Sequence, residues 1–150
     1  THQQPITSNY SPTTYHQQPG TNTMRKSIHT DKGAPPKGPY SQAVVASGTM
    51  VYLASQGPID PATGERIQGT FRQKAERVFQ NVTTLLEAAG TDWSHVVRTV
   101  VFLNDMGNFA EMNDVYLQFA QAPYPARTTA QSNIGTAEIF VECTAVLPEA

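Results

Sequence analysis

The sequence is poor in cysteine and in charge, and it has no long apolar run. Cys143 is the only cysteine among the 150 residues, which excludes a disulfide bond within the chain and fits a reducing compartment. No stretch approaches the roughly 20 apolar residues that a membrane-spanning helix needs. We therefore expect a protein that does not enter membranes, and the composition fits a cytoplasmic location.

Charge and motif spacing argue against several classes of function. Lys, Arg, Asp and Glu make up 15% of the chain, less than in most globular proteins, and the formal net charge is −2. The longest basic run is Arg25-Lys26, so nothing predicts the basic face that binds nucleic-acid phosphates. The four histidines lack the spacing of a metal site, and no glycine-rich phosphate loop is present. We expect no metal, no cofactor and no nucleic-acid partner.

The beginning of the chain has a composition of its own. Residues 1–23 are mainly Thr, Gln, Ser, Pro, His, Asn and Tyr, with Ile6 as the one aliphatic side chain. Such a stretch cannot bury enough apolar surface to offset its ordering entropy. We expect residues 1–30 to form a disordered polar extension and residues 31–150 to form one domain. The extension also has features of a mitochondrial transit peptide, although Arg25 is its only arginine.

Apolar periodicity divides the rest of the chain into strands and helices. We expect strands at 41–46, 50–55, 96–103, 127–131 and 138–147, and helices at 70–89 and 108–121. Thr70 and Gln73 form a capping box at the start of the longer helix, and Gly90 follows its last apolar position. Asn108 and Glu111 have the spacing of a second capping box.

The resulting order, β-β-α-β-α-β-β, predicts a single α+β domain. Strand–helix–strand crossovers place successive strands parallel, whereas the turn at Ser47-Gly48 joins the first two strands as an antiparallel hairpin. The expected product is a mixed sheet with both helices on one face. Nothing else in the domain can cover the other face, so we expect it to pack against another subunit.

The last strand carries a carboxylate among apolar side chains. Glu142 shares one face of the strand with Phe140 and Thr144, whereas Cys143 points to the face that we expect the helices to bury. A glutamate here is most often exposed on a solvated face. If the face is instead a subunit interface, Glu142 needs a partner, and Arg127 near the start of the neighbouring strand is a candidate. Alone, such an arginine is more often a surface charge.

Seven segments together resemble the RidA/YjgF reactive-intermediate deaminase family. They include a Gly38-Pro-Tyr motif, a Pro-Ala-Arg127 motif and a Val141-Glu142 pair, and they follow the family's order. Each segment alone is a weak signal, but together they are highly specific. The segments are 34–42, 56–64, 81–90, 100–103, 108–116, 124–127 and 141–142.

The resemblance implies a homotrimer with a chorismate-mutase-like fold and three clefts between subunits. It also implies a hydrolytic deaminase that converts 2-imino acids, such as 2-aminoacrylate or 2-iminobutanoate, to 2-keto acids and ammonia. By the same resemblance, Arg127 binds the substrate carboxylate through a bidentate pair, and Glu142 positions or activates the attacking water.

Four further residues are assigned to substrate binding by the resemblance. Tyr40 corresponds to a wall or hydrogen-bonding residue of the cleft, and Asn113 to an asparagine near the site. Thr129 stands where many members have cysteine, and its backbone N–H could still bind substrate. Ser55 corresponds to a glycine whose backbone commonly lines the site.

The chain departs from the family pattern at two places within the domain, and its N-terminal extension has no counterpart in the family's minimal domain. Ala54-Ser55 replaces the usual Ser-Gly pair, and Ser55 would be strained if that glycine needs a positive φ. The link between Tyr116 and Arg127 is also shorter than in many members. Both departures bear on the choice of substrate, because Arg127 and Glu142 are retained.

Two other functions therefore stay open. One is a specialised pathway enzyme of the same scaffold that acts on a larger imine, a possibility that Ala54-Ser55 maintains. The other is a non-catalytic protein that binds small carboxylates or acts like a chaperone. A chaperone-like role would depend on exposed apolar surface and would survive the loss of Arg127.

Overall fold

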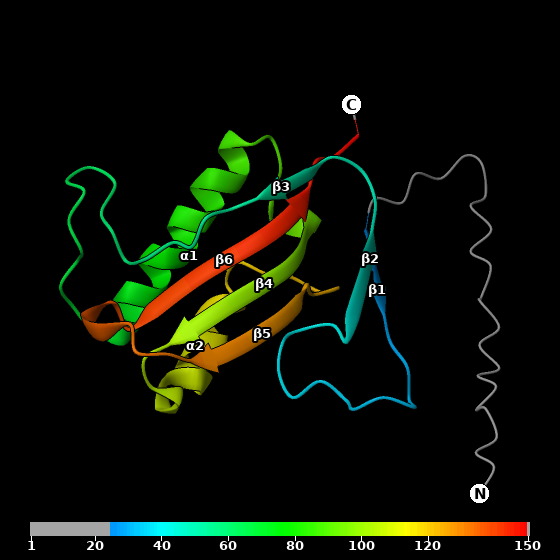
Figure 1. Cartoon of the computed structure of the whole chain (residues 1–150), viewed down its shortest axis with the longest axis horizontal. Helices are drawn as coiled ribbons and strands as arrows, with labels where there is room; N and C mark the ends of the chain where they lie inside the picture. Colours follow the sequence, from blue (N-terminus) through cyan, green and yellow to red (C-terminus); the bar gives the residue numbers. More distant parts are fainter. Residues whose placement is uncertain (1–24, 150) are drawn as a thin grey trace, which may run out of the picture.

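The computed structural model describes residues 25–149 (Figure 1). Most of the predicted extension, residues 1–24, lies outside the described residues. Its last part is ordered, which corrects the expectation for residues 25–30: Arg25–Ile28 form strand β1, paired antiparallel with β2 (Ala43–Ala46). The side chain of Arg25 donates hydrogen bonds to Val96 O at 2.6 Å and Pro123 O at 2.7 Å. These long-range bonds order a segment that has no apolar periodicity of its own.

The main sheet is mixed, as predicted. It has four strands in the order β3-β6-β4-β5, with β3 at Met50–Tyr52, β4 at Val96–Leu103, β5 at Ala126–Gln131 and β6 at Ile139–Val146. Strands β4 and β5 are parallel, whereas β6 is antiparallel to both of its neighbours. Helices α1 (Phe71–Ala88) and α2 (Phe109–Tyr116) both lie behind this sheet in Figure 1. The predicted α+β class and the one-sided placement of the helices are confirmed.

The predicted hairpin between the first two strands of the domain is wrong. The chain does bend between these strands, at Gly48-Thr49, but β2 pairs with β1 in a separate two-stranded sheet. Strand β3 instead pairs with the last strand, in a register that places Met50 opposite Val146. The backbone N–H of Leu147 extends this pairing by donating to Thr49 O at 2.9 Å. Strands β2 and β3 therefore each pair with another strand, β1 and β6 respectively, and not with one another.

Helix α1 begins and ends as its sequence predicts. The Gln73 side chain accepts from Thr70 N–H at 2.9 Å, and Thr70 Oγ1 accepts from Gln73 N–H at 3.3 Å, which completes the capping box. Gly90 follows the C-cap with a φ of +85°, a conformation that suits glycine.

Helix α2 differs from its prediction at both ends. Asn108 makes no side-chain capping bond, so the second capping box is wrong. The carboxylate of Asp105 instead accepts from Gly107 N–H at 2.8 Å, in a 3-10 turn that precedes the helix. The helix ends at Tyr116, before the predicted end near residue 121.

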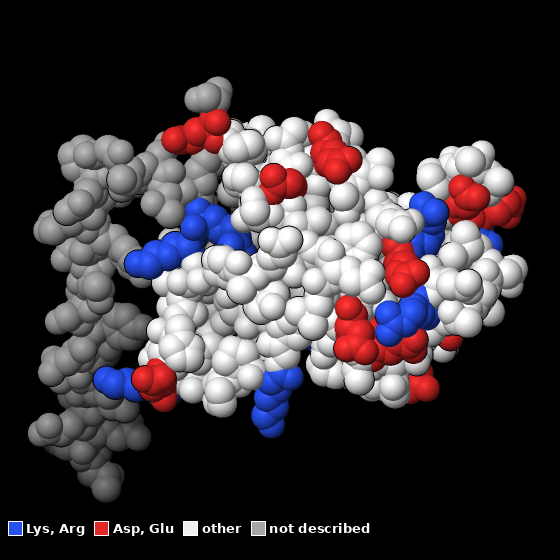
Figure 2. Space-filling model, turned by 180° about the vertical axis from the view of Figure 1, so that it is seen from behind, with Lys and Arg blue, Asp and Glu red and all other residues white. Residues whose placement is uncertain are grey.

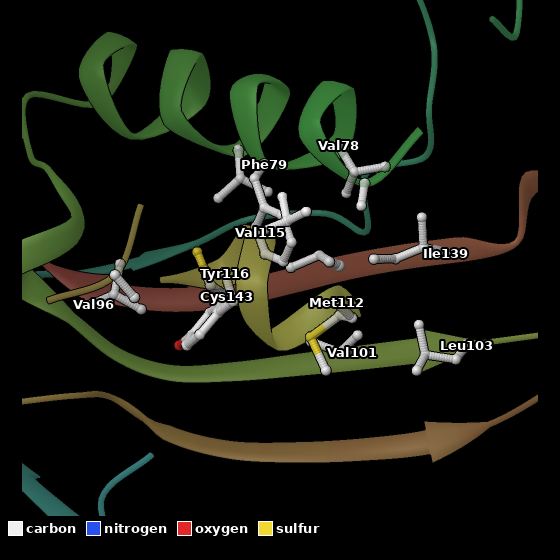
Figure 3. Packing of buried hydrophobic residues seen from close by; sticks show 14 of the residues in the cluster. Val78, Phe79, Val96, Val101, Leu103, Met112, Val115, Tyr116, Ile139 and Cys143 are labelled. Atoms are coloured by element: carbon white, nitrogen blue, oxygen red, sulfur yellow. The ribbon is translucent and has the colours of Figure 1, made fainter. Parts of the chain in front are cut away.

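The core lies between the helices and the sheet (Figure 3). On β6, Ile139, Val141, Cys143 and Ala145 are buried, whereas Phe140, Glu142 and Thr144 are partly exposed. The predicted alternation of this strand is therefore confirmed from Ile139 to Ala145, whereas Val146, which the alternation assigns to the other face, is also buried. Burial raises the pKa of the Cys143 thiol to about 12, with the nearby charge of Glu142 acting in the same direction.

Figure 2 shows the face that carries the helices. There the Lys and Arg side chains are interspersed with Asp and Glu and with broad uncharged areas. Arg72 on α1 lies 3.3 Å from Glu111 on α2. The buried Lys74 lies 2.5 Å from Glu138, which precedes β6. Ion pairs thus tie α1 to its neighbours on two sides.

The opposite face of the sheet, which we call the open face, points toward the viewer in Figure 1. Val100, Phe102 and Phe140 are only partly buried there, and Tyr52 is 76% exposed. Across residues 25–149, none of the helices combines the length and the hydropathy that spanning a membrane requires.

Candidate functional site

Arg127 lies on the helix side of the sheet, at the start of β5. It is in register with Thr99, whose hydroxyl lies 3.1 Å from the hydroxyl of Tyr116 on α2. The guanidinium carbon of Arg127 lies 5.0, 5.4 and 5.7 Å from the ring centres of Tyr116, Tyr40 and Phe109, respectively. Aromatic faces attract a cation at such distances. Three rings therefore hold the guanidinium in place.

Burial controls the electrostatics of this cluster. It lowers the pKa of Arg127 below its usual value, although the hydroxyls of Tyr116 and Tyr40 act in the opposite direction. An arginine nevertheless stays charged in a protein. Burial also raises the pKa of Tyr116 to about 12, so the phenol beside the guanidinium is neutral at physiological pH. The cluster thus holds a cation without an anion.

The unpartnered polar atoms of the described residues are concentrated here. Buried side-chain atoms that lack a hydrogen-bond partner are Asn113 Oδ1, Thr129 Oγ1 and the two terminal nitrogens of Arg127. All belong to predicted site residues. A buried polar group without a partner costs free energy, and a buried unpaired charge costs more. Because the missing partner of Arg127 must accept hydrogen bonds and balance a positive charge, the geometry fits an anionic ligand.

A loop, residues 33–40, covers the guanidinium. A Cβ added at Gly38 would lie 3.2 Å from Arg127 Nη2 and 3.6 Å from Asn113 Nδ2. The hydroxyl of Tyr40 accepts from the N–H of Lys37 at 2.9 Å, which leaves the ring as the wall of the cluster.

The same loop is fastened at its base by Gln42. Its side chain accepts from Thr30 N–H at 2.7 Å and donates to Ala34 O at 2.8 Å.

We call Tyr40, Asn113, Arg127 and Thr129 the arginine group.

Glu142 lies on the open face, away from the arginine group. It is in register with Val100, and its neighbours Val141 and Cys143 point into the core. The predicted pairing of Glu142 with Arg127 is therefore wrong within one protomer, because the two side chains leave the sheet in opposite directions. Glu142 instead borders a hollow of about 350 Å³ on the open face. Its lining residues are Tyr52, Leu53, Arg98, Val100, Glu142, Cys143 and Thr144.

Ser55 lies beside Glu142. The backbone of Leu53 donates to Cys143 O at 3.0 Å, and Gln56 and Val141 exchange hydrogen bonds at 2.8 and 3.0 Å. Ala54 and Ser55 therefore bulge from the edge of the sheet opposite Glu142. In residues 25–149, Glu138 is the one non-glycine residue with a positive φ, so the strain expected at Ser55 is absent. We call Ser55 and Glu142 the glutamate group.

Sequence reasoning does not find every residue beside these two groups. Phe109 and Tyr116 flank the arginine group, and their spacing from Asn113 on α2 is the signal that could reveal them. Arg98 lies beside the glutamate group through the strand register, which the sequence alone does not show. Within the described part of the chain, no three His, Cys, Asp or Glu side chains come together as a metal site would require.

Comparison with known proteins identifies relatives that span most of this chain. The profile of the family described as Endoribonuclease L-PSP matches residues 31–147. Protein DfrA of Myxococcus xanthus is 49% identical over 108 residues, which are 71% of this chain and 82% of that protein. The 2-iminobutanoate/2-iminopropanoate deaminase of Bos taurus is 40% identical over 108 residues, covering 72% and 78% of the two chains. The crystal structure of E. coli TdcF with bound serine superposes with a TM-score of 0.61 at 32% identity, covering 82% of this chain and 99% of that chain.

Proposed function

This chain belongs to the endoribonuclease L-PSP family, which contains the YjgF and RidA proteins, and from that premise we propose that it hydrolyses reactive 2-imino acids to 2-keto acids and ammonia. The observation that carries the proposal is the buried guanidinium of Arg127, whose terminal nitrogens have no hydrogen-bond partner among residues 25–149. Mammalian relatives that bear the name 2-iminobutanoate/2-iminopropanoate deaminase support the reaction type.

In this proposal Arg127 binds the substrate carboxylate. Its two terminal nitrogens can donate in parallel to the two oxygens of a carboxylate, which fixes the orientation of the ligand. Asn113 and Thr129 hold unpartnered oxygens beside it, and these can accept from the imine N–H or from an attacking water. TdcF, a relative in which serine is bound, supports a small ligand that carries a carboxylate.

The glutamate group must come from a second copy of the chain. Arg127 and Glu142 leave opposite faces of one sheet, so a small imino acid cannot touch both within one protomer. We propose a homotrimer with a chorismate-mutase-like arrangement, in which the arginine group of one subunit faces the glutamate group of the next. The partly exposed apolar side chains of the open face support this assembly, because a neighbouring subunit would bury them.

The reaction needs positioning and proton transfer more than strong activation. Water adds to the C=N carbon while Glu142 accepts one of its protons and passes it to the imine nitrogen, which becomes an amine. The aminol then loses ammonia as its hydroxyl proton moves through the same carboxylate, which leaves the 2-keto acid. Because 2-imino acids also hydrolyse in water, orientation by Arg127 and a fixed base suffice for acceleration.

A coupled assay tests the proposal. A pyridoxal-phosphate dehydratase acting on serine or threonine supplies the imine, and keto-acid formation is followed beyond the uncatalysed rate. We expect wild-type protein to accelerate hydrolysis, Arg127→Ala to abolish the acceleration, and the control Arg77→Ala on α1 to retain it. Full activity of Arg127→Ala at unchanged oligomeric mass would refute the mechanism.

A larger imine is the second candidate substrate. The hollow of about 350 Å³ beside Glu142 and the adjacent bulge at Ala54-Ser55 would accommodate a side chain longer than that of threonine. A wild-type protein that fails on both small imines but binds a longer 2-keto acid through Arg127 would favour this candidate. Binding without any turnover would favour a non-catalytic carboxylate-binding role.

The name of the family also suggests RNA cleavage as a function. The net charge of −2 and the absence of a basic run longer than Arg25-Lys26 favour a small-molecule substrate over nucleic acid.

A further inference from the structure

Arg98 on β4 shares the open face with Glu142. It is in register with Thr144, and Val100, two residues on, is in register with Glu142. Residues two apart on a strand point to the same side, so Arg98 is a diagonal neighbour of Glu142, with Cα atoms typically about 7–8 Å apart. Both side chains line the same hollow.

Neither charge has an opposite partner within 4 Å among the described residues. Two other titratable residues border the hollow: Tyr52, whose side chain is exposed, and Cys143, whose thiol is buried in the core on the other side of the sheet. Arg127, the cation expected to pair with Glu142, lies on the other face of the sheet. Arg98 is therefore the cation that the hollow offers to Glu142.

A subunit packed on the open face would change both the solvation of Arg98 and Glu142 and the attraction between them. Each would lose water, and an unpaired charge in a desolvated site is costly. Their attraction would grow as the surroundings become less polar. Since a guanidinium offers five donors on a long, flexible side chain, it can reach across the hollow and still present a directed hydrogen bond.

We propose that Arg98 is the positioning residue of Glu142. It donates to one carboxylate oxygen in the assembled protein and leaves the other oxygen directed at the water. The inference rests on the proposed function for the role of Glu142, but the ion pair itself can be tested without turnover.

The ion pair is tested by a double-mutant cycle on the full-length assembled protein. Arg98→Gln and Glu142→Gln should each lower the midpoint of thermal unfolding by roughly 2–8 °C, because each leaves a buried charge alone. The double variant should lose clearly less than the sum of the two. Lys26→Gln, at the exposed position of strand β1, is the control and should show no coupling to Glu142→Gln. Additive losses for Arg98 and Glu142 would overturn the proposal.

The positioning role is tested by kinetics in the coupled assay. Arg98→Gln should lower kcat about 10- to 100-fold, as a displaced reacting group does, with little change in KM. Arg98→Lys should restore most of the loss, because it returns a donor and a positive charge. A rise in KM alone, or no rescue by lysine, would overturn the positioning role.

Failure of the proposed function is distinguishable from failure of this inference. If wild-type protein accelerates neither imine, the deaminase proposal fails, while the double-mutant cycle still decides whether the pair exists. If wild-type protein is active but the cycle is additive, the inference fails and the deaminase proposal stands.

Discussion

Arg127 and Glu142 leave the same four-stranded sheet on opposite faces, one toward α2 and the other toward the open face. Their register partners on β4 are consecutive residues, Thr99 and Val100, and consecutive residues of a strand point in opposite directions. The two groups best suited to bind and hydrolyse an imino acid are therefore separated within one chain. Assembly would have to bring them together.

The first prediction is complementation between inactive variants. Arg127→Ala and Glu142→Gln should each be inactive, but a 1:1 mixture refolded together should recover about a quarter of wild-type activity. In a closed ring, each cleft has about one chance in four of pairing an intact arginine with an intact glutamate. Activity of the refolded mixture is compared with that of each variant refolded alone. A mixture as inactive as its components would contradict a site shared between subunits.

The second prediction concerns the shape of the cation. Arg127→Lys keeps the charge but loses the two parallel donors, so kcat/KM should fall about 10- to 100-fold. Arg77→Lys, at a partly exposed position of α1, is the matched control. Steady-state kinetics with the imine of threonine provides the measurement. Equal values for Arg127→Lys and wild type would show that charge alone is sufficient at this position.

The third prediction concerns the loop above the guanidinium. In Gly38→Ala the new methyl group would lie 3.2 Å from Arg127 Nη2 and must displace it slightly. We expect a severalfold lower kcat/KM. Thermal stability should change little, because the atoms that the methyl group would meet belong to side chains that can shift. Lys37→Ala, at an exposed neighbouring position, should behave as wild type. An unaffected Gly38→Ala would mean that the loop moves away when the substrate binds.

The fourth prediction concerns the single thiol. With a pKa raised to about 12, Cys143 has about one part in 10,000 of thiolate at pH 8. An aromatic disulfide reagent should not label the native protein at pH 8, but should label it after denaturation with urea. Cys143→Ala should retain activity. Rapid labelling of the native protein would show that the reagent reaches the thiol of Cys143 in the folded state.

The fifth prediction is a loss of stability at alkaline pH. The pKa of Tyr116 is raised to about 12 in the folded chain, against about 10 for an unfolded tyrosine. A raised folded pKa means that the stabilisation is complete below pH 10 and is lost as the pH rises through 12. In urea unfolding, wild type should therefore lose more stability between pH 8 and pH 11 than Tyr116→Phe does. Equal losses of stability in wild type and Tyr116→Phe would mean that another group causes the alkaline transition, and Cys143 would be the next candidate.

Much of the fold could be predicted from local patterns. The apolar period of residues 70–89, the capping box at Thr70 and the glycine at position 90 specify helix α1 without any tertiary contact. The alternation along β6 likewise predicts which side chains are buried. Patterns of this kind are reliable because burial of one face and satisfaction of terminal backbone groups depend on residues close in sequence.

The differences between expectation and structure have a common cause. Local patterns do not reveal strand β1, and they favour a pairing of β2 with β3. Strands can pair with partners far away in the sequence, and the backbone hydrogen bonds of competing pairings are chemically alike. The local pattern therefore does not show which pairing forms. The second capping box is wrong because Asp105 provides an earlier capping acceptor. The strain expected at Ser55 is absent because the backbone at this residue does not take a positive φ.

The sequence by itself determined the candidate chemistry, because its motifs point to Arg127, Glu142, Tyr40, Asn113 and Thr129 without any knowledge of how the strands pair. Only the tertiary structure decided on which side of the sheet each one lies. Strand β5, Ala-Arg-Thr-Thr-Ala-Gln, has no contrast between apolar and polar positions, so its sequence cannot show which face is buried. That choice is made by the register with β4 and by the aromatic rings on α2 and in the 33–40 loop.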